Sequence, residues 1–312
     1  MLDLVINEPK PEDIPSKLRP LMKAFQSAPF HVAPEREEEL LVLRDKYDIR
    51  IYLKGDAENW LFEERRMLKK IFIGLRTLER LWAYCYGYNA IVSELQKADG
   101  DGQAVANQPE FRLGFQLLEW ASQKELRDIE GGWPHSLPDP SDSEQLEHVR
   151  AANHIFLMMS GRLLLHEFAH TVLEHGTKPG ATSEVLKSEE IEADKWADDW
   201  MLQRWTDYKR DEKVFIGRCH GIACAHVPTL VLGLDAKIVS PSHPSPIERI
   251  LSFVSRHLGV GNPLDRRPID FPAAFLVTVA SQLVFMKHKV LLFEPVPSTY
   301  EKWFRRFERY FP

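Results

Sequence analysis

Hydrophobic residues recur at helical spacing along most of the chain, whereas strict alternation of apolar and polar positions is confined to two short stretches. These stretches, residues 48–54 and 70–75, are typical of strands. Helical spacing predicts helices at residues 16–26, after Pro34, at 77–97, 111–126 and 155–173, and from Ser188, a candidate N-cap, onward. We therefore expect an α+β fold that is predominantly α-helical, with a small N-terminal sheet.

A segment rich in Gly, Pro, Ser and Asp interrupts these patterns at residues 131–143. As a linker, it would divide the chain into an N-terminal α/β lobe, residues 1–130, and a helical lobe, residues 131–312. As a loop at a cleft, it would belong to one continuous domain. The chain has 312 residues, of which 44% are hydrophobic, and this is enough for either arrangement.

The helical segment 155–173 contains L-H-E-F-A-H, in which His166 and His170 lie one turn apart on the same face. Two imidazoles with this spacing can hold one zinc ion, while Glu167 projects toward the open coordination position and can deprotonate a water there. Apart from these three residues, nearly every position of the segment is apolar, so we expect the helix to be buried. Burial of the three polar side chains would be costly without a metal. The alternative is a structural helix that carries two incidental histidines.

A zinc hydrolase needs a third protein ligand, and Glu190 is the nearest good candidate. The stretch 176–183 predicts a loop, after which the acidic helix would return antiparallel to the first. Asp194 lies four residues after Glu190, where its carboxylate could accept a hydrogen bond from a ligating histidine and fix the tautomer. Glu189 and Glu192 are competing ligands, but only Glu190 pairs at i, i+4 with Asp194.

Two other groups of possible ligands fit known metal sites less well. The pattern H-E-x-x-H-x-x-G-x-x-H requires Gly and His at the positions of Leu173 and Gly176, so His175 is expected to lie at a helix C-terminus instead. The run C-H-G-I-A-C-A-H, residues 219–226, matches no common zinc-finger spacing. A helical core segment is expected there, with a second zinc site as the alternative.

Cysteine content and charge indicate a cytoplasmic protein that acts on other proteins. Three cysteines, Cys85, Cys219 and Cys224, give no disulfide framework and favour a reducing compartment. The first residues lack the basic start and apolar core of a signal peptide. The apolar stretch 271–286 is short and interrupted by polar residues, so we expect a buried helix and no membrane partner. A net charge of -6 with mixed signs gives no general attraction to nucleic acid.

Five landmarks along the chain resemble those of one known family. They are S-A-P-F-H-V-A-P-E-R-E-E-E-L at residues 27–40, L-E-R-L-W-A-Y at 78–84, the H-E-F-A-H helix, the E-I-E-A-D segment and S-H-P-S-P-I-E-R-I at 242–250. The E-I-E-A-D segment is similar to that of glutamate-ligand zincins, in which the third ligand is the Glu four residues before the Asp. In this order, the landmarks resemble the phage-exclusion protease Lit family over most of the chain.

The resemblance implies a zincin-like metallopeptidase: a cytoplasmic bacterial zinc endopeptidase. Its implied substrate is translation elongation factor Tu, whose cleavage stops protein synthesis in a phage-infected cell. A phage-derived activator is a second candidate partner. The residues themselves support the metal-dependent hydrolysis, whereas the substrate comes from the resemblance alone.

In the expected mechanism, His166, His170 and Glu190 hold the zinc ion. Glu167 takes a proton from the attacking water and later delivers it to the leaving amine. His243, in the His-Pro element, would donate a hydrogen bond to the oxyanion of the tetrahedral intermediate, mainly on the basis of the resemblance. The alternative is that His243 is a turn residue in a Ser- and Pro-rich loop.

The substrate could pair with the strand predicted at residues 70–75, if that strand forms a sheet edge beside the site.

Two other functions stay open. One is a zincin that cleaves a different protein, such as a transcriptional repressor. The other is a non-catalytic, zinc-containing sensor or binding module, although a purely structural zinc site would close its fourth position and would not need Glu167.

Overall fold

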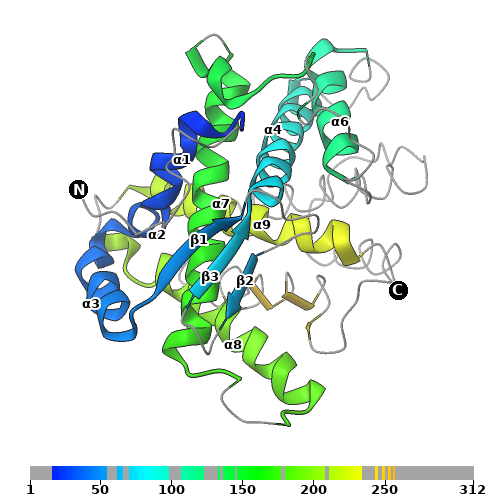
Figure 1. Cartoon of the computed structure of the whole chain (residues 1–312). Coiled ribbons are helices and arrows are strands. Elements are labelled where there is room, and N and C mark those ends of the chain that lie inside the picture. The colour runs from blue at the N-terminus through cyan, green and yellow to red at the C-terminus, as the bar shows by residue number, and fades with distance from the viewer. Residues whose placement is uncertain are drawn as a thin grey trace.

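A single long helix, α7 (Glu147–Val172), runs through the centre of the molecule, and elements from the whole described chain pack against it (Figure 1). The computed structural model describes residues 16–54, 62–65, 70–97, 107–122, 133, 136–144, 146–176, 180–207, 211–233, 243–244, 248–249, 252–253 and 256. Helices in contact with α7 are α1 (Arg19–Gln26), α2 (Ala28–His31), α3 (Glu37–Tyr47), α4 (Leu75–Lys97), α8 (Ser183–Leu202) and α9 (Glu212–Gly233). Packing from several directions therefore holds the side chains of α7 in place.

The remaining helical elements are α6 (Pro109–Ser122) and the short 3-10 helices η2 (Pro34–Arg36), η5 (Pro140–Glu144) and η6 (Trp205–Asp207). Helix α6 packs along α4 (Figure 1), and the two helices approach closely at a pair of glycines. A Cβ atom on Gly87 would lie 2.5 Å from the carbonyl oxygen of Gly114. The described residues are mostly helical and include one small sheet, so the predicted predominantly helical α+β class is confirmed.

Three short strands form a mixed sheet with the order β1-β3-β2. Strand β1 (Arg50–Lys54) runs parallel to β3 (Lys70–Gly74), and β2 (Phe62–Arg65) runs antiparallel to β3. Because β3 is hydrogen-bonded on both sides, the prediction that residues 70–75 form an edge strand for a substrate is wrong. Among the described strands, the two edges are β1 and β2, and β2, which the alternation pattern missed, contacts α7.

Helix α7 begins at Glu147, earlier than the segment 155–173 in which the hydrophobic pattern predicts it. Its first two turns are amphipathic and carry few apolar residues. Val149 is fully buried, whereas Glu147 and Arg150 are exposed. One buried face is enough to extend the helix, because packing of that face supplies most of its stability.

Helix α8 also begins earlier than expected, at Ser183. The side-chain oxygen of Thr182 accepts a hydrogen bond from the backbone N–H of Val185 at 3.4 Å, which caps the first turn. Ser188, the predicted N-cap, therefore lies inside the helix. Both residue types are good caps, and the acidic helix simply starts at the earlier of the two.

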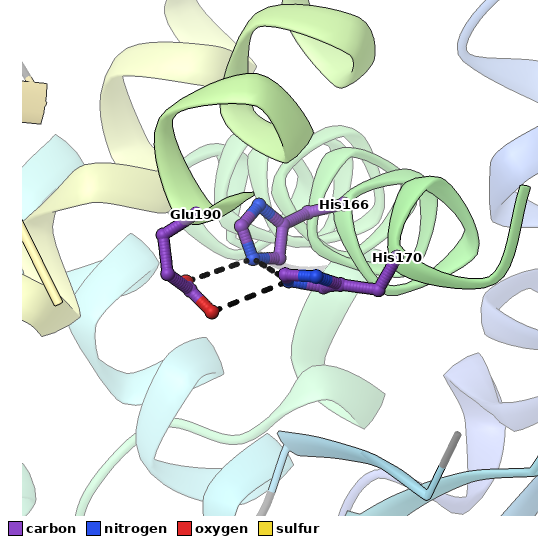
Figure 2. Close-up of side chains that lie close together, drawn as sticks. All are labelled: His166, His170 and Glu190. Carbon is purple, nitrogen blue, oxygen red and sulfur yellow. Dashed lines mark hydrogen bonds and ion pairs between the residues drawn. The ribbon is translucent and has the colours of Figure 1, made fainter. Parts of the chain in front are cut away.

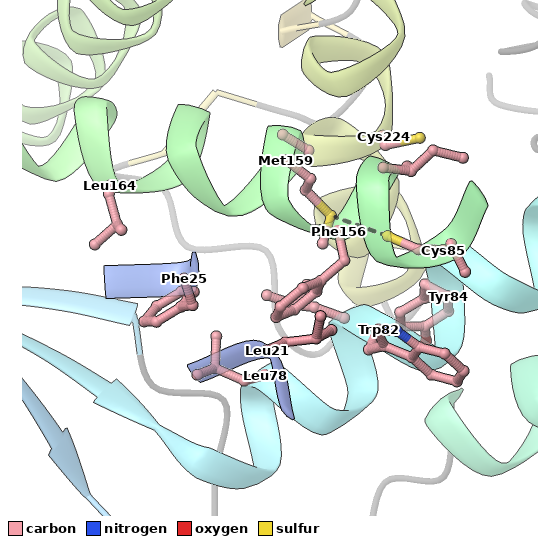
Figure 3. Close-up of a cluster of buried hydrophobic side chains, with 14 of the residues drawn as sticks. Leu21, Phe25, Leu78, Trp82, Tyr84, Cys85, Phe156, Met159, Leu164 and Cys224 are labelled. Carbon is pink, nitrogen blue, oxygen red and sulfur yellow. Dashed lines mark hydrogen bonds between the residues drawn. The ribbon is translucent and has the colours of Figure 1, made fainter. Parts of the chain in front are cut away.

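A dense apolar cluster fixes one side of α7 (Figure 3). Phe156 of α7 stacks on Phe25 of α1, with ring centroids 6.2 Å apart. Gly161 lets α7 approach α2 closely, since a Cβ atom at this position would lie 3.0 Å from the carbonyl oxygen of Ala28. These contacts set the rotation of α7 about its own axis, and with it the direction in which His166 points.

The three cysteines are free and buried. Two of them, with the buried His226, belong to the segment 219–226, which lies within α9, so the prediction of a helical core segment there is confirmed. Among the described helices, none combines the length and the apolar character that crossing a bilayer requires. The stretch 271–286 lies outside the described residues.

Candidate metal centre

Helices α7 and α8 pack against each other and bring three predicted ligands together (Figure 2). Nε2 of His166 lies 3.2 Å from Nε2 of His170, both on α7. The Glu190 carboxylate on α8 faces them: its Oε2 lies 3.4 Å from His166 Nε2 and its Oε1 lies 3.3 Å from His170 Nε2. All three side chains are buried.

This geometry fits a metal ion held by three protein ligands. The three residues each offer one ligand atom, and these atoms lie within 4.8 Å of one another. Ligand atoms of a tetrahedral zinc site, with bonds of about 2.0 Å, lie about 3.3 Å apart. The two Nε2 atoms lie 3.2 Å apart, and each of them lies 3.3 to 3.4 Å from a different oxygen of the Glu190 carboxylate, so the carboxylate faces both rings at distances close to that value. Among the described residues, this is the group of His, Cys, Asp and Glu side chains that could hold a metal.

Asp194 lies behind His166, on the side away from the other ligands. Its Oδ1 is 2.9 Å from Nδ1 of His166, within hydrogen-bonding distance. A carboxylate that accepts the Nδ1 proton leaves the Nε2 lone pair free to face a metal and fixes the orientation of the ring. The structure thus places Asp194 where the i, i+4 spacing from Glu190 predicted it.

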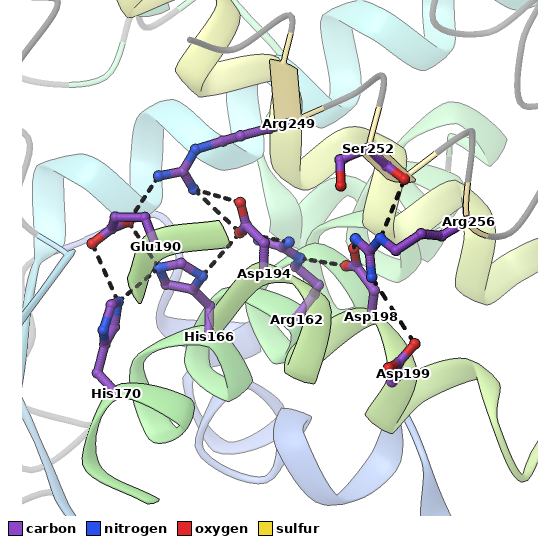
Figure 4. Close-up of polar contacts among 10 residues, drawn as sticks. All are labelled: Arg162, His166, His170, Glu190, Asp194, Asp198, Asp199, Arg249, Ser252 and Arg256. Atoms are coloured by element: carbon purple, nitrogen blue, oxygen red, sulfur yellow. Dashed lines mark hydrogen bonds and ion pairs between the residues drawn. The ribbon is translucent and has the colours of Figure 1, made fainter. Parts of the chain in front are cut away.

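Three carboxylates on one face of α8 alternate with three buried or half-buried arginines behind the site (Figure 4). The carboxylates are Glu190, Asp194 and Asp198, and the arginines are Arg162, Arg249 and Arg256. Arg249 reaches two of them: Nη2 donates to Glu190 Oε2 at 2.8 Å, and Nη1 donates to Asp194 Oδ1 at 3.2 Å. Arg249 thus joins the carboxylates of Glu190 and Asp194.

Arg162, a buried residue on α7, belongs to the same network of ion pairs. It donates from Nη2 to Asp194 Oδ1 at 2.8 Å and from Nε to Asp198 Oδ1 at 3.1 Å. The guanidinium is almost fully buried, and a buried charge is tolerated only with such partners. The role of Arg162 was not predicted from the sequence, although a lone arginine one turn before His166 in an apolar helix was a signal of it.

Neighbouring charged side chains strongly shift the pKa values of residues in the cluster. Burial disfavours a charged His166 ring, but the carboxylates of Asp194 and Glu190 outweigh burial and raise its pKa to about 9. Burial likewise opposes ionisation of Asp194, yet Arg162, Arg249 and His166 hold the pKa of Asp194 well below its usual range. Without a metal, a protonated His166 therefore lies between ionised carboxylates.

We expect zinc binding to release about one proton from His166 at pH 7, since a ligating nitrogen must first lose its proton. The pKa of His166 is raised to about 9, so the proton competes with the metal below that pH. The apparent zinc affinity should fall about tenfold for each pH unit below 9 and level off above it. Calorimetric titration of the metal-free protein in two buffers of different ionisation enthalpy measures the number of protons released. A constant zinc affinity from pH 6 to 8 would contradict the expected competition between the proton and the metal.

Glu167 and His243, the two other predicted site residues, lie beside the cluster. Glu167 is largely buried and follows His166 on α7, so by the helical period its side chain projects about 60° from that of His170. His243 Nε2 lies 3.7 Å from Glu190 Oε1, and the His243 side chain is 53% exposed. Glu167 thus lies on the same helix as the two histidines, and His243 lies at the solvent-exposed side of the site.

The competing glutamates are engaged elsewhere. Glu189 Oε1 accepts a hydrogen bond from the backbone N–H of Gly176 at 2.9 Å, and Glu192 Oε2 lies 3.3 Å from Nε2 of His175. Glu190 is the glutamate of α8 that faces the two histidines. The helical period explains this, because neighbouring positions on a helix project about 100° apart.

The family model described as peptidase U49 matches residues 71–261, which contain α7, α8 and the segment with His243 and Arg249. The chain belongs to the peptidase U49 family. This peptidase is also similar to the "Cell death peptidase" of Escherichia coli (strain K12), with 28% identity over 250 residues, covering 78% of this chain and 82% of that protein. No solved structure matches it.

These matches confirm the family resemblance and show that the protein is a protease. The alternative of a non-catalytic sensor therefore has no support. The candidate metal centre lies entirely within the matched residues, as expected if the centre belongs to the enzyme's active site.

Proposed function

We propose that this peptidase is a zinc-dependent endopeptidase with a zincin-like active site, in which His166, His170 and Glu190 are the zinc ligands. One observation carries the proposal: the Nε2 atoms of His166 and His170 lie 3.2 Å apart, and the buried Glu190 carboxylate of the neighbouring helix faces both, with one oxygen 3.4 Å from the first and the other oxygen 3.3 Å from the second. The donor set of two imidazoles and one carboxylate is typical of catalytic zinc, which keeps its fourth position open for water or substrate.

The remaining residues have roles that follow from their positions. Bound zinc would supply a Lewis acid that polarises the scissile carbonyl and lowers the pKa of water. Glu167 takes the proton of the attacking water and delivers it to the leaving amine. Asp194 holds the Nδ1 proton of His166 and so keeps Nε2 available as a ligand atom. His243, half-exposed beside Glu190, donates a hydrogen bond to the oxyanion that develops on the substrate.

The proposed substrate is translation elongation factor Tu, cleaved in the cytoplasm during phage exclusion, with a phage-derived protein as activator. The name of the E. coli relative supports a peptidase whose action harms its own cell, and the landmarks at residues 27–40 and 242–250 support the phage-exclusion family. The buried free cysteines, Cys85, Cys219 and Cys224, are compatible with a reducing compartment.

Zinc-loaded protein incubated with elongation factor Tu, with and without a lysate of phage-infected cells, tests the proposal. We expect one defined cleavage by mass spectrometry, lost after chelation and restored by added zinc. Hydrolysis that survives complete removal of metal would overturn the zinc assignment. Intact elongation factor alongside zinc-dependent cleavage of another cellular protein would overturn the substrate and leave the chemistry standing.

A further inference from the structure

The turn that follows α7 folds back and places His175 beside His170. The backbone N–H of His175 donates to the carbonyl oxygen of His170 at 3.0 Å. On the other side of the turn, Glu189 of α8 accepts from the N–H of Gly176. Hydrogen bonds to both helices thus fix the backbone around His175.

The turn adopts an unusual backbone conformation to do so. Glu174 has φ 57° and Gly176 has φ 62°, both in the left-handed region. Gly is the usual residue at such a position after a helix, whereas a non-glycine residue is strained there. The strain at Glu174 is therefore offset by the contacts that the turn makes, including those of the His175 ring.

The His175 ring connects His170 to an acidic residue at the surface. Nδ1 of His175 lies 3.0 Å from Nδ1 of His170, and the two rings meet edge to face with centroids 5.1 Å apart. Nε2 of His175 lies 3.3 Å from Oε2 of Glu192. The His175 side chain is 5% exposed, whereas that of Glu192 is 61% exposed.

The geometry admits one consistent set of proton positions when a metal is bound. His170 presents Nε2 to the metal cluster, so its ring proton resides on Nδ1 and can be donated to Nδ1 of His175. His175 then carries its own proton on Nε2 and donates it to the Glu192 carboxylate. Each group in the chain acts as donor or acceptor without conflict.

We propose that His175 is a positioning residue that fixes the tautomer and ring orientation of His170, as Asp194 does for His166. This inference rests on the proposed zinc centre. It assigns different partners to the two histidine ligands: a buried carboxylate for His166, and an imidazole linked to an exposed carboxylate for His170. Partners of this kind typically change metal affinity by about 10- to 100-fold.

Two substitutions separate the hydrogen bond from simple packing. His175→Phe keeps a ring but removes the acceptor, whereas His175→Asn offers an amide oxygen close to the former Nδ1 position. We expect His175→Phe to weaken zinc binding by about 10- to 100-fold in competition with a chromophoric chelator. His175→Asn should stay within about threefold of wild type, since the acceptor is retained. His154→Phe, at an exposed position of α7, is the matched control and should leave the affinity unchanged.

Two spectroscopic readouts complete the test. At saturating cobalt, the visible bands should shift in His175→Phe and stay unchanged in His175→Asn. In the wild-type zinc protein, ¹⁵N spectra of the imidazoles should show His170 protonated on Nδ1 and His175 protonated on Nε2, a measurement that requires no variant to fold.

Three results would overturn the positioning role: a wild-type affinity and cobalt spectrum in His175→Phe, an Asn variant as weak as the Phe variant, or the opposite tautomer of His175. If wild-type protein binds zinc stoichiometrically while any of these is observed, the zinc centre stands and only the role of His175 fails. If wild-type protein binds no zinc, the proposed function fails and the inference falls with it.

Discussion

Replacing Glu167 with Gln is expected to leave zinc bound and to lower kcat by at least a hundredfold. Glutamine has nearly the same shape, so the packing of this largely buried position is preserved. Its amide cannot take a proton from water or return one to the leaving amine, and general acid–base catalysis contributes typically about 10²- to 10⁴-fold. The measurements are kcat on the cleaved protein and zinc content by elemental analysis.

The matched control for this substitution is Glu147→Gln, at the exposed start of the same helix. It should retain both zinc and wild-type turnover. A fully active Glu167→Gln variant would remove Glu167 from the mechanism. A variant that loses zinc together with activity would instead place Glu167 among the metal ligands.

Replacing Glu190 with Ala is expected to abolish stoichiometric zinc binding and, with it, hydrolysis. The substitution removes the ligand supplied by α8 and leaves only the two histidines of α7. Loss of an outer partner of a ligand already weakens metal binding by about 10- to 100-fold, so loss of the ligand itself should exceed about 100-fold. Elemental analysis of purified wild-type and variant protein, prepared with added zinc, measures the effect.

The fold should survive this substitution, because Arg249 keeps its contact with Asp194 when Glu190 is removed. Circular dichroism of the metal-free proteins checks this point. Glu184→Ala, in the exposed first turn of α8, is the control and should bind about one zinc per chain. Retention of zinc at wild-type affinity by Glu190→Ala would show that the wrong glutamate was assigned.

Features that depend on the helical period were predictable from the sequence. The period places His166 and His170 on one face, and it places Glu190 in line with Asp194, whatever surrounds the helices. The predominance of helix and the existence of a sheet were predictable for the same reason, because both follow from local hydrophobic spacing. The predicted loop before α8 was sufficient for the two helices to pack side by side.

Strand order could not be read from the sequence. Alternation marks a strand by its two faces, but hydrogen bonding between strands depends on segments that are separate in the chain. For this reason β3 was taken for an edge strand, and β2 (Phe62–Arg65) was missed. The early starts of α7 and α8 were also undetermined, since one depends on a buried face and the other on a choice between two capping residues.

The sequence by itself determined the proposed donor set: two histidines and a glutamate with the spacing for one metal, and beside them the glutamate that we propose moves protons. Only the tertiary structure decided which other side chains contact the proposed ligands. Arg249 reaches α8 from 55 residues beyond Asp194, and His175 reaches His170 through a turn with left-handed residues. Helical periodicity acts between neighbours in the chain, whereas ion pairs and hydrogen bonds of this kind depend on where distant backbone segments come to rest.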